Sequence, residues 1–348
     1  MYGSCNAIYK LTHNMIFTEI KRIAEQKVIY KGLAKLSNKV IPYEYKFDHN
    51  GSQIFELLRQ SPYYPMGKAG EQIAHRSAGD IANILGPRCH LVDMGCGMGK
   101  VSRIYAEQLL PESTVYPVDI SKIAVDYCVN SLHRIPTIKI GISRPLDFLH
   151  GLDSAVRNRK PGETICAALF GGTIANFTRV DAHIFLKKVR TQLVKGDYFM
   201  LATDMEKPKH IIEEAYNDPL LLAASWNLNT LAHINTVFTP WNTGKKESMQ
   251  TPFNVRDFQH KAKYFDSHDA PNNQHLAMYV VAKKDVTINI PYMGTISIKK
   301  DEEIQTYESH RFTDEQIKNI AATTGFEIIR FDESNPDWRF CHTLLRVA

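Results

Sequence analysis

Three closely spaced glycines, Gly95, Gly97 and Gly99, form a Gly-x-Gly-x-Gly pattern directly after an apolar run that contains Asp93. A second apolar run ends at Asp119, one crossover later in the chain. Glycine lets the backbone approach a ligand closely and adopt positive φ, and an acidic residue that ends the next strand accepts hydrogen bonds from both hydroxyls of a ribose. The residue types and their spacing therefore predict a site for an adenosyl compound.

Three families of nucleotide sites use such a turn, and the local sequence separates them. A phosphate-binding P-loop requires Gly-x-x-x-x-Gly-Lys-Ser/Thr, but Met94 occupies the first glycine position and Val101 follows Lys100. A dinucleotide fold requires Gly-x-Gly-x-x-Gly, which differs from the pattern here. A neutral turn beside acidic groups suits the cationic sulfonium of S-adenosylmethionine (SAM) better than a pyrophosphate. The turn thus favours SAM, with an NAD-dependent oxidoreductase as the alternative.

Helix and strand patterns alternate around this turn, which predicts a parallel sheet with crossover helices. Ser121 is the expected N-cap of one of these helices. The predicted helices are 70–85, 101–110, 121–133 and 181–193, and the predicted strands are 89–94, 115–119, 137–143, 164–170 and 198–203.

The alternation stops after residue 205. A helical stretch over 208–236 and β-rich sequence to about residue 305 predict an inserted segment, after which a helix over 313–324 and strands over 326–331 and 338–347 resume the fold. A helix followed by two strands is how the sheet of class I methyltransferases ends, so this ending favours SAM over NAD.

The expected fold is therefore α/β, a class I methyltransferase Rossmann-like doubly wound sheet with a second α+β substrate-binding domain. Upstream, Ile16, Ile20 and Ile23 predict one apolar face of an amphipathic helix. The expected parts are an N-terminal part of the substrate-binding domain (1–68), the SAM-binding core (69–205), the inserted substrate-binding domain (206–310) and the last helix and strands of the sheet (311–348).

Composition is that of an ordinary globular protein, with 348 residues, 44% hydrophobic, 23% charged and a net charge of +5. No block of like charges indicates nucleic acid, and no apolar run is long enough to span a membrane. Six widely spaced cysteines without a Cys-x-x-Cys pair fit reduced thiols, and no Cys/His spacing predicts a metal site. We expect a cytoplasmic monomer whose partner is a small molecule.

Five segments together resemble one family, the L-histidine Nα-methyltransferases of ergothioneine biosynthesis, and the similarity runs over about residues 45–348. The segments are Phe47-Asp-x-x-Gly-Ser-x-x-Phe55, Pro62-Tyr-Tyr-Pro65, the glycine turn, Phe170-Gly-Gly-Thr-Ile-Ala-Asn176-Phe, and Ala215-Tyr-Asn-Asp218 with Trp226-Asn-x-Asn229.

This resemblance implies a SAM-dependent enzyme that methylates the α-amino group of a free amino acid, up to the trimethylammonium. The implied cofactor residues are Gly95, Gly97, Gly99, Lys100, Asp119, Asp147 and Phe148. The implied substrate residues are Phe47, Tyr63, Gly171, Asn176, Tyr216, Trp226, Met278, Tyr307, Glu308 and Ser309. Among these, Asn176, Tyr216 and Tyr63 are the implied catalytic residues, with Asn176 expected to orient the amine. Met278 matches a side chain that lines the pocket for the substrate ring.

Two departures from the family pattern concern the substrate. Phe47 stands where the family has a tyrosine near the α-amine, and the family's Glu-x-Ser pair that binds the imidazole aligns with Tyr307-Glu308-Ser309. A site that lacks the carboxylate loses its preference for a ring N–H, unless Glu308 takes over that role. The substrate is then histidine or another aromatic amino acid. Alternatives are a different small amine, or a non-catalytic protein that binds SAM or an amino acid.

Some residues invite a structural interpretation instead. Asn227 and Asn229 are expected to cap a helix, and Cys96 is expected to be a small buried thiol without an adjacent base. Lys100 is as consistent with a solvated helix position as with SAM binding.

Overall fold

The computed structural model describes residues 19–238, 252–290, 293–334 and 338–348. Within it the chain divides into two compact units. Unit 1 comprises residues 1–58, 213–263 and 277–308, and unit 2 comprises residues 59–212, 264–276 and 309–348. Residues 59–68 and 264–276, expected with the substrate-binding parts, thus fall in unit 2. Cys5 and Ile16 lie outside the described residues.

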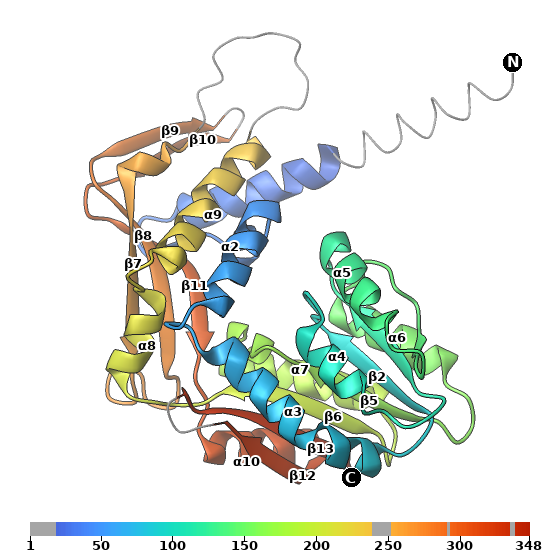
Figure 1. The fold of residues 1–348 in the computed structure, drawn as a ribbon. Helices are drawn as coiled ribbons and strands as arrows, with labels where there is room; N and C mark the ends of the chain where they lie inside the picture. The colour runs from blue at the N-terminus through green and yellow to red at the C-terminus, as the bar shows by residue number, and fades with distance from the viewer. Residues whose placement is uncertain (1–18, 239–251, 291–292, 335–337) are drawn as a thin grey trace, which may run out of the picture. The chain divides into compact units, whose positions relative to one another are not determined.

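Unit 2 is built on a seven-stranded sheet in the order β12-β13-β6-β5-β2-β3-β4 (Figure 1). The strands are β2 (Cys89–Met94), β3 (Thr114–Val118), β4 (Lys139–Ile140), β5 (Thr164–Leu169), β6 (Tyr198–Asp204), β12 (Phe326–Glu333) and β13 (Phe340–Val347). All neighbours pair in parallel except β13, which is antiparallel to both β6 and β12. The expected sheet of a class I methyltransferase, with its antiparallel last strand, is confirmed.

Helices cover both faces of this sheet. On one face α6 (Phe148–Asn158), α7 (Arg179–Gln192) and α10 (Asp314–Thr324) enclose a core to which Val92, Ile165 and Phe199 contribute from the strands. On the other lie α3 (Met66–Leu85), α4 (Lys100–Ala106) and α5 (Lys122–Leu132). Because parallel strands between two helical layers are buried on both sides, β2 is apolar along most of its length and all six of its residues are buried.

Local signals place several helix ends correctly. The side chain of Ser121 accepts a hydrogen bond from the Ala124 amide and caps α5, as predicted. Thr313 and Gln316 form a reciprocal capping box at the start of α10, and Gly325 ends that helix in the left-handed conformation.

The observed secondary structure differs from the predicted one in three places. The strand expected over 137–143 is only Lys139–Ile140, an edge strand that pairs with β3 alone. The helix α6 was not expected at all. The helix expected over 208–236 is two helices, α8 (Lys209–Tyr216) and α9 (Leu222–Phe238), because Pro219 disfavours a helical conformation at Asp218, which caps α9 by accepting from the Leu222 and Ala223 amides.

Unit 1 contains most of a second sheet, in the order β1-β11-β8-β7, and a β9-β10 hairpin. The strands are β1 (Lys39–Val40), β7 (Phe258–Phe265), β8 (His275–Ala282), β9 (Val286–Ile290), β10 (Gly294–Ile298) and β11 (Glu303–His310). The short helix η1 (Tyr43–Lys46) precedes α2 (His49–Gln60). Residues from β8, α9 and the hairpin form one core, with Val280 and Leu231 fully buried.

The N-terminal helix of unit 1, described over 19–33, buries a different face from the one expected. Ile20 and Ile23 are exposed, whereas Ile29 and Leu33 are fully buried in the core of the unit. The packed face is therefore the one that contains Ile29 and Leu33, and no signal in the isoleucine spacing distinguishes the two faces.

No helix in the described part of the chain is both long enough and apolar enough to cross a membrane.

Candidate functional site

The glycine turn follows β2 at the carboxyl edge of the unit 2 sheet. Gly95, Gly97 and Gly99 all have positive φ, at 88°, 49° and 71°, respectively. A side chain at Gly99 would lie 2.7 Å from Sγ of Cys128, whereas one at Gly97 would meet no atom within 4 Å. Gly99 therefore serves the packing of α4 against α5, and Gly97 leaves space beside the turn for a ligand.

Two buried or half-buried carboxylates hold this turn. Asp119, after β3, accepts hydrogen bonds from the Gly97 amide at 3.2 Å and the Ser121 amide at 2.9 Å. Asp93, the fifth residue of β2, is buried and accepts from the Ser102 hydroxyl. Burial raises the pKa of Asp93 to about 7 and also raises that of Asp119. A cationic ligand nearby would favour the ionised form of both groups.

The carboxyl ends of β3, β2 and β5 meet at one edge, because these strands are neighbours in the sheet. Phe148, the first residue of α6, and Thr173, in the short helix η2 (Thr173–Asn176) after β5, both flank the turn. A Cβ built on Gly95 would lie 3.4 Å from the Phe148 ring and 3.7 Å from the Thr173 hydroxyl. Segments predicted to contact the cofactor and the substrate thus converge on this edge, where open α/β sheets bind ligands.

The remaining predicted residues of unit 2 are placed as follows. Asp147 is exposed and caps α6, accepting from the amide and the ring of His150. Gly171 is exposed, with positive φ and no atom within 4 Å of an added Cβ. Tyr63 and Asn176 are half-buried, and Lys100 is exposed at the start of α4. Asp147 therefore has a structural role as a cap, which the sequence did not suggest.

Unit 1 contains four of the five aromatic residues predicted to hold the substrate, together with Phe55, whereas Tyr63 belongs to unit 2. Phe47, Phe55, Tyr216, Trp226 and Tyr307 form a group that we call the aromatic cluster. Trp226 is fully buried, with ring centroids 5.5 Å from Phe47, 4.8 Å from Phe55 and 5.2 Å from Tyr307. Tyr216 lies 6.5 Å from Tyr307. In the part of the chain that the structure describes, the buried indole N–H of Trp226 has no hydrogen-bond partner, so an acceptor on a ligand would satisfy it.

The predicted Tyr307-Glu308-Ser309 segment is in β11, where each side chain has a different environment. Tyr307 belongs to the aromatic cluster. The half-buried Glu308 carboxylate accepts a hydrogen bond from Nε2 of the Gln305 side chain at 2.8 Å. Ser309 belongs to unit 2, where its hydroxyl accepts from the Arg311 guanidinium at 2.8 Å. Met278, in β8 of unit 1, is fully buried.

Asn227 and Asn229 do not cap a helix, contrary to expectation, because both are within α9 rather than at its start. The Asn229 amide donates to the Asp48 carboxylate at 2.7 Å. Asn227 is fully buried and accepts from Nζ of Lys46 at 2.5 Å. Lys46 is itself fully buried beside the aromatic cluster and was missed, since a lysine between aromatic residues gives no signal of burial in the sequence.

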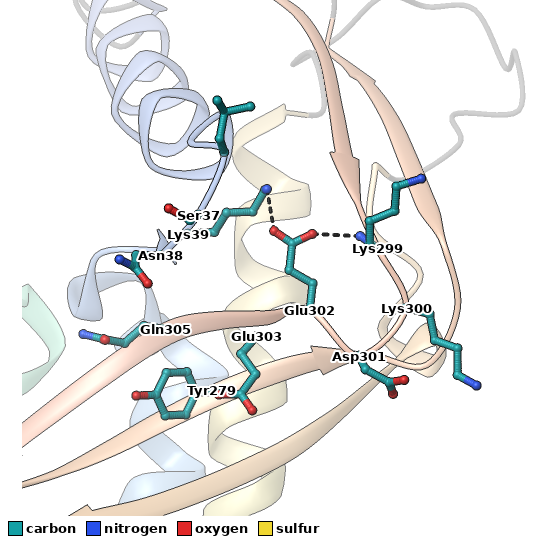
Figure 2. A pocket seen from close by; sticks show the side chains of 11 residues that line it. Ser37, Asn38, Lys39, Tyr279, Lys299, Lys300, Asp301, Glu302, Glu303 and Gln305 are labelled. Atoms are coloured by element: carbon teal, nitrogen blue, oxygen red, sulfur yellow. Dashed lines mark hydrogen bonds and ion pairs between the residues drawn. The ribbon is translucent and has the colours of Figure 1, made fainter. Parts of the chain in front are cut away.

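A pocket with a volume of about 630 Å³ lies in unit 1, lined in part by Lys39, Lys299 and Glu302 (Figure 2). It contains none of the predicted site residues. Lys39 donates to the Glu302 carboxylate at 2.6 Å, and Glu302 also accepts from the Lys299 backbone amide. Because the charges of Lys39 and Glu302 pair with each other, we assign no ligand to this pocket.

Among the described residues, no group of three or more His, Cys, Asp or Glu side chains is arranged to hold a metal ion. The described cysteines are all buried and free, and the thiol of Cys96 has a raised pKa because of its contact with Cys128 and its burial.

The strand order, the antiparallel last strand and a glycine turn followed by an acidic residue define a class I SAM-dependent methyltransferase. The particular family follows from comparison with known proteins. The model of the histidine-specific, SAM-dependent methyltransferases matches residues 24–347, so the chain belongs to that family. It is an N-methyltransferase that uses SAM, and the resemblance seen in the sequence is confirmed.

Curated relatives agree with this family. The histidine N-alpha-methyltransferase of Mycobacterium tuberculosis is 24% identical over 91% of this chain and 94% of its own length. Ergothioneine biosynthesis protein 1 of Schizosaccharomyces pombe is 22% identical over 91% of this chain, which spans 40% of that longer protein. A 4-dimethylallyltryptophan N-methyltransferase of Aspergillus fumigatus is 25% identical over 68% of this chain and 69% of its own length.

Proposed function

We propose that this enzyme methylates the α-amino nitrogen of a free amino acid with a planar ring side chain, histidine or another aromatic amino acid, up to the trimethylammonium. The observation that carries this proposal is the aromatic cluster in unit 1. It gathers Phe47, Tyr216, Trp226 and Tyr307, which the family pattern assigns to the substrate, around a buried indole N–H. Aromatic side chains offer their faces and edges to a ring.

Two features favour an aromatic ring beyond imidazole. Tyr307 occupies the aligned position of the family's imidazole-binding carboxylate, and Glu308 already accepts from Gln305. The relative from Aspergillus fumigatus bears a name that specifies a substituted tryptophan as its substrate. Histidine remains the substrate that the family description names.

Methyl transfer is an in-line displacement whose barrier falls through positioning and exclusion of water. The nitrogen lone pair forms the new N–C bond while the C–S bond breaks, and its electrons return to sulfur to give neutral S-adenosylhomocysteine. The amine must attack as the neutral base, so it releases one proton for each methyl group it receives. We assign Asn176 to the orientation of the amine, and Tyr63 and Tyr216 to hydrogen bonds that hold the amino acid.

Mass spectrometry of reactions with SAM and each proteinogenic amino acid tests this proposal. We expect mono-, di- and trimethylated products from an aromatic amino acid, and at least a tenfold lower kcat/KM in an Asn176→Ala enzyme, as for other groups that position a reactant. Tyr307→Glu is the matched variant for specificity, since it restores an acceptor for a ring N–H and should raise kcat/KM for histidine relative to other aromatic amino acids. Absence of any methylated amino acid, with S-adenosylhomocysteine still bound, would contradict the proposal.

A further inference from the structure

Lys46 lies at the centre of a buried hydrogen-bond network in unit 1. Its Nζ donates to Oδ1 of Asn227 at 2.5 Å and to the hydroxyl of Thr230 at 3.3 Å. The same Nζ lies 4.9 Å from the ring centroid of Trp226 and 6.0 Å from that of Tyr307. The lysine therefore contacts both the α9 helix and the faces of the aromatic cluster.

Asn227 connects the lysine to the strands. Its Oδ1 also accepts from the hydroxyl of Thr306, and its Nδ2 donates to the Tyr279 carbonyl at 2.8 Å and to Nδ1 of His260 at 2.9 Å. A carboxamide has two acceptor and two donor positions, so Asn227 uses all four. We call the residues Lys46, Asn227, Thr230, His260 and Thr306 the Lys46 network.

His260 extends the network to α8. Because its Nδ1 accepts from Asn227, Nε2 carries the ring proton and donates to the carbonyl of Tyr216 at 2.8 Å. Burial lowers the pKa of His260, which is consistent with this neutral ring. The hydrogen bonds thus form one continuous chain from Lys46 to the backbone of Tyr216.

Five residues of unit 1 predicted to hold the substrate adjoin this network in the chain or accept a hydrogen bond from it. Phe47 follows Lys46 in the chain, Trp226 precedes Asn227, and Tyr307 follows Thr306. The hydroxyl of Thr306 shares its one proton between Oδ1 of Asn227 and the carbonyl of Met278, which is 3.1 Å away, and the carbonyl of Tyr216 accepts from His260. Two of these residues, Met278 and Tyr216, are therefore bonded to the network through their carbonyls, and the other three are its neighbours in the chain.

Burying a lysine side chain costs free energy, because its amine loses contact with water. Burial lowers the pKa of Lys46 well below its usual range, and its hydrogen-bond partners in the described part of the chain are neutral. An apolar side chain of similar length would avoid this desolvation. The amine is instead placed where it fixes Asn227, which suggests a positional role.

We propose that Lys46 and Asn227 are positioning residues that set the orientation of the side chains facing the amino-acid substrate and thereby its specificity. This inference deepens the proposed function and rests on it. Neither residue is assigned a contact with the substrate. Their effect passes through Trp226, Tyr307 and the backbone of Tyr216.

Lys46→Met and Asn227→Leu test the proposal, with Asn235→Leu as the matched control. Asn235 is a buried asparagine of the same helix, and its side chain bonds the amide and carbonyl of Phe253 at 2.9 Å and 2.8 Å. It adjoins none of the predicted substrate residues in the chain. Thr306→Val, which removes one hydroxyl with little change of shape, replaces either test variant that fails to fold.

The measurements are kcat and KM for the two best amino acids, Kd for S-adenosylhomocysteine, and the unfolding temperature. We expect the test variants to lose about tenfold or more in kcat/KM for the amino acid and to change the ratio between the two amino acids, as small misplacements do. The Kd for S-adenosylhomocysteine should change less than about twofold, because the change removes no group assigned to the cofactor. Asn235→Leu should lower the unfolding temperature and leave the ratio unchanged.

A purely structural role would lower the unfolding temperature of the test variants without changing the ratio, and that result would overturn the inference while leaving the proposed function intact. A wild-type enzyme that methylates no amino acid would instead overturn the proposed function and the inference together.

Discussion

Replacing Gly97 and Gly99 by alanine, one at a time, separates the part of the glycine turn that serves folding from the part that serves SAM. Both glycines have positive φ, so alanine at either position costs about 1–2 kcal/mol of backbone strain. They differ in what the new methyl group meets. At Gly99 it would lie 2.7 Å from Sγ and 3.0 Å from Cα of Cys128, whereas at Gly97 it would meet nothing within 4 Å.

The backbone of α5 cannot move aside as a side chain can, so Gly99→Ala adds a steric cost of about 1–3 kcal/mol to the strain. The total of about 2–5 kcal/mol should lower the unfolding temperature by roughly 4–20 °C. Gly97→Ala should lose only the strain, about 1–2 kcal/mol. Its methyl group, however, projects into the space beside the turn where the cofactor is expected, so the affinity for S-adenosylhomocysteine should fall about tenfold or more.

Thermal unfolding and isothermal titration calorimetry of both variants measure these two effects. Gly196→Ala is the matched control, since Gly196 also has positive φ and open space around an added Cβ but precedes β6, away from the turn. It should resemble Gly97→Ala in stability and bind S-adenosylhomocysteine like the wild type. Wild-type affinity in Gly97→Ala would refute the placement of the cofactor against this turn, and equal stability of the Gly97 and Gly99 variants would refute the steric argument.

Two further predictions concern the carboxylates at the turn. Asp119→Asn removes a charged acceptor expected to bind the ribose and should weaken SAM binding by about 10- to 100-fold, as measured by calorimetry; an unchanged Kd would contradict that role. Burial raises the pKa of Asp93 from 3.8 to about 7, so the native state holds this proton more tightly than the unfolded chain. The contribution of Asp93 to stability is therefore full below about pH 4 and is lost progressively as the pH rises to 7, by up to about 4 kcal/mol. Asp93→Asn should flatten that part of the profile in urea unfolding between pH 4 and 8, and a profile that keeps its slope would show that other groups cause it.

Predictions of secondary structure were confirmed where the interactions that form the element involve only residues close together in the chain. The apolar run of β2 and the cap at Ser121 need only neighbouring residues to act, and both are confirmed. Long-range packing decided the cases that went wrong. Ile20 is exposed while Ile29 is buried in the core of unit 1, and the strand near residue 140 pairs with β3 over only two residues.

The class of the protein and its cofactor follow from patterns in the sequence. The glycine turn, the acidic residue after the next strand and the order of helices and strands act through backbone conformation and short-range connection, which a linear pattern records. Family membership follows from the same residues read together.

The surroundings of the predicted substrate residues in unit 1 follow from tertiary packing alone. Lys46 and Asn227 are 181 positions apart in the chain, and their hydrogen bond exists because η1 and α9 pack together. A lysine in an aromatic segment and an asparagine in a helix each look like surface residues until burial is known. Burial is a property of the packed unit, since it depends on side chains brought together from distant segments, and no local pattern encodes it.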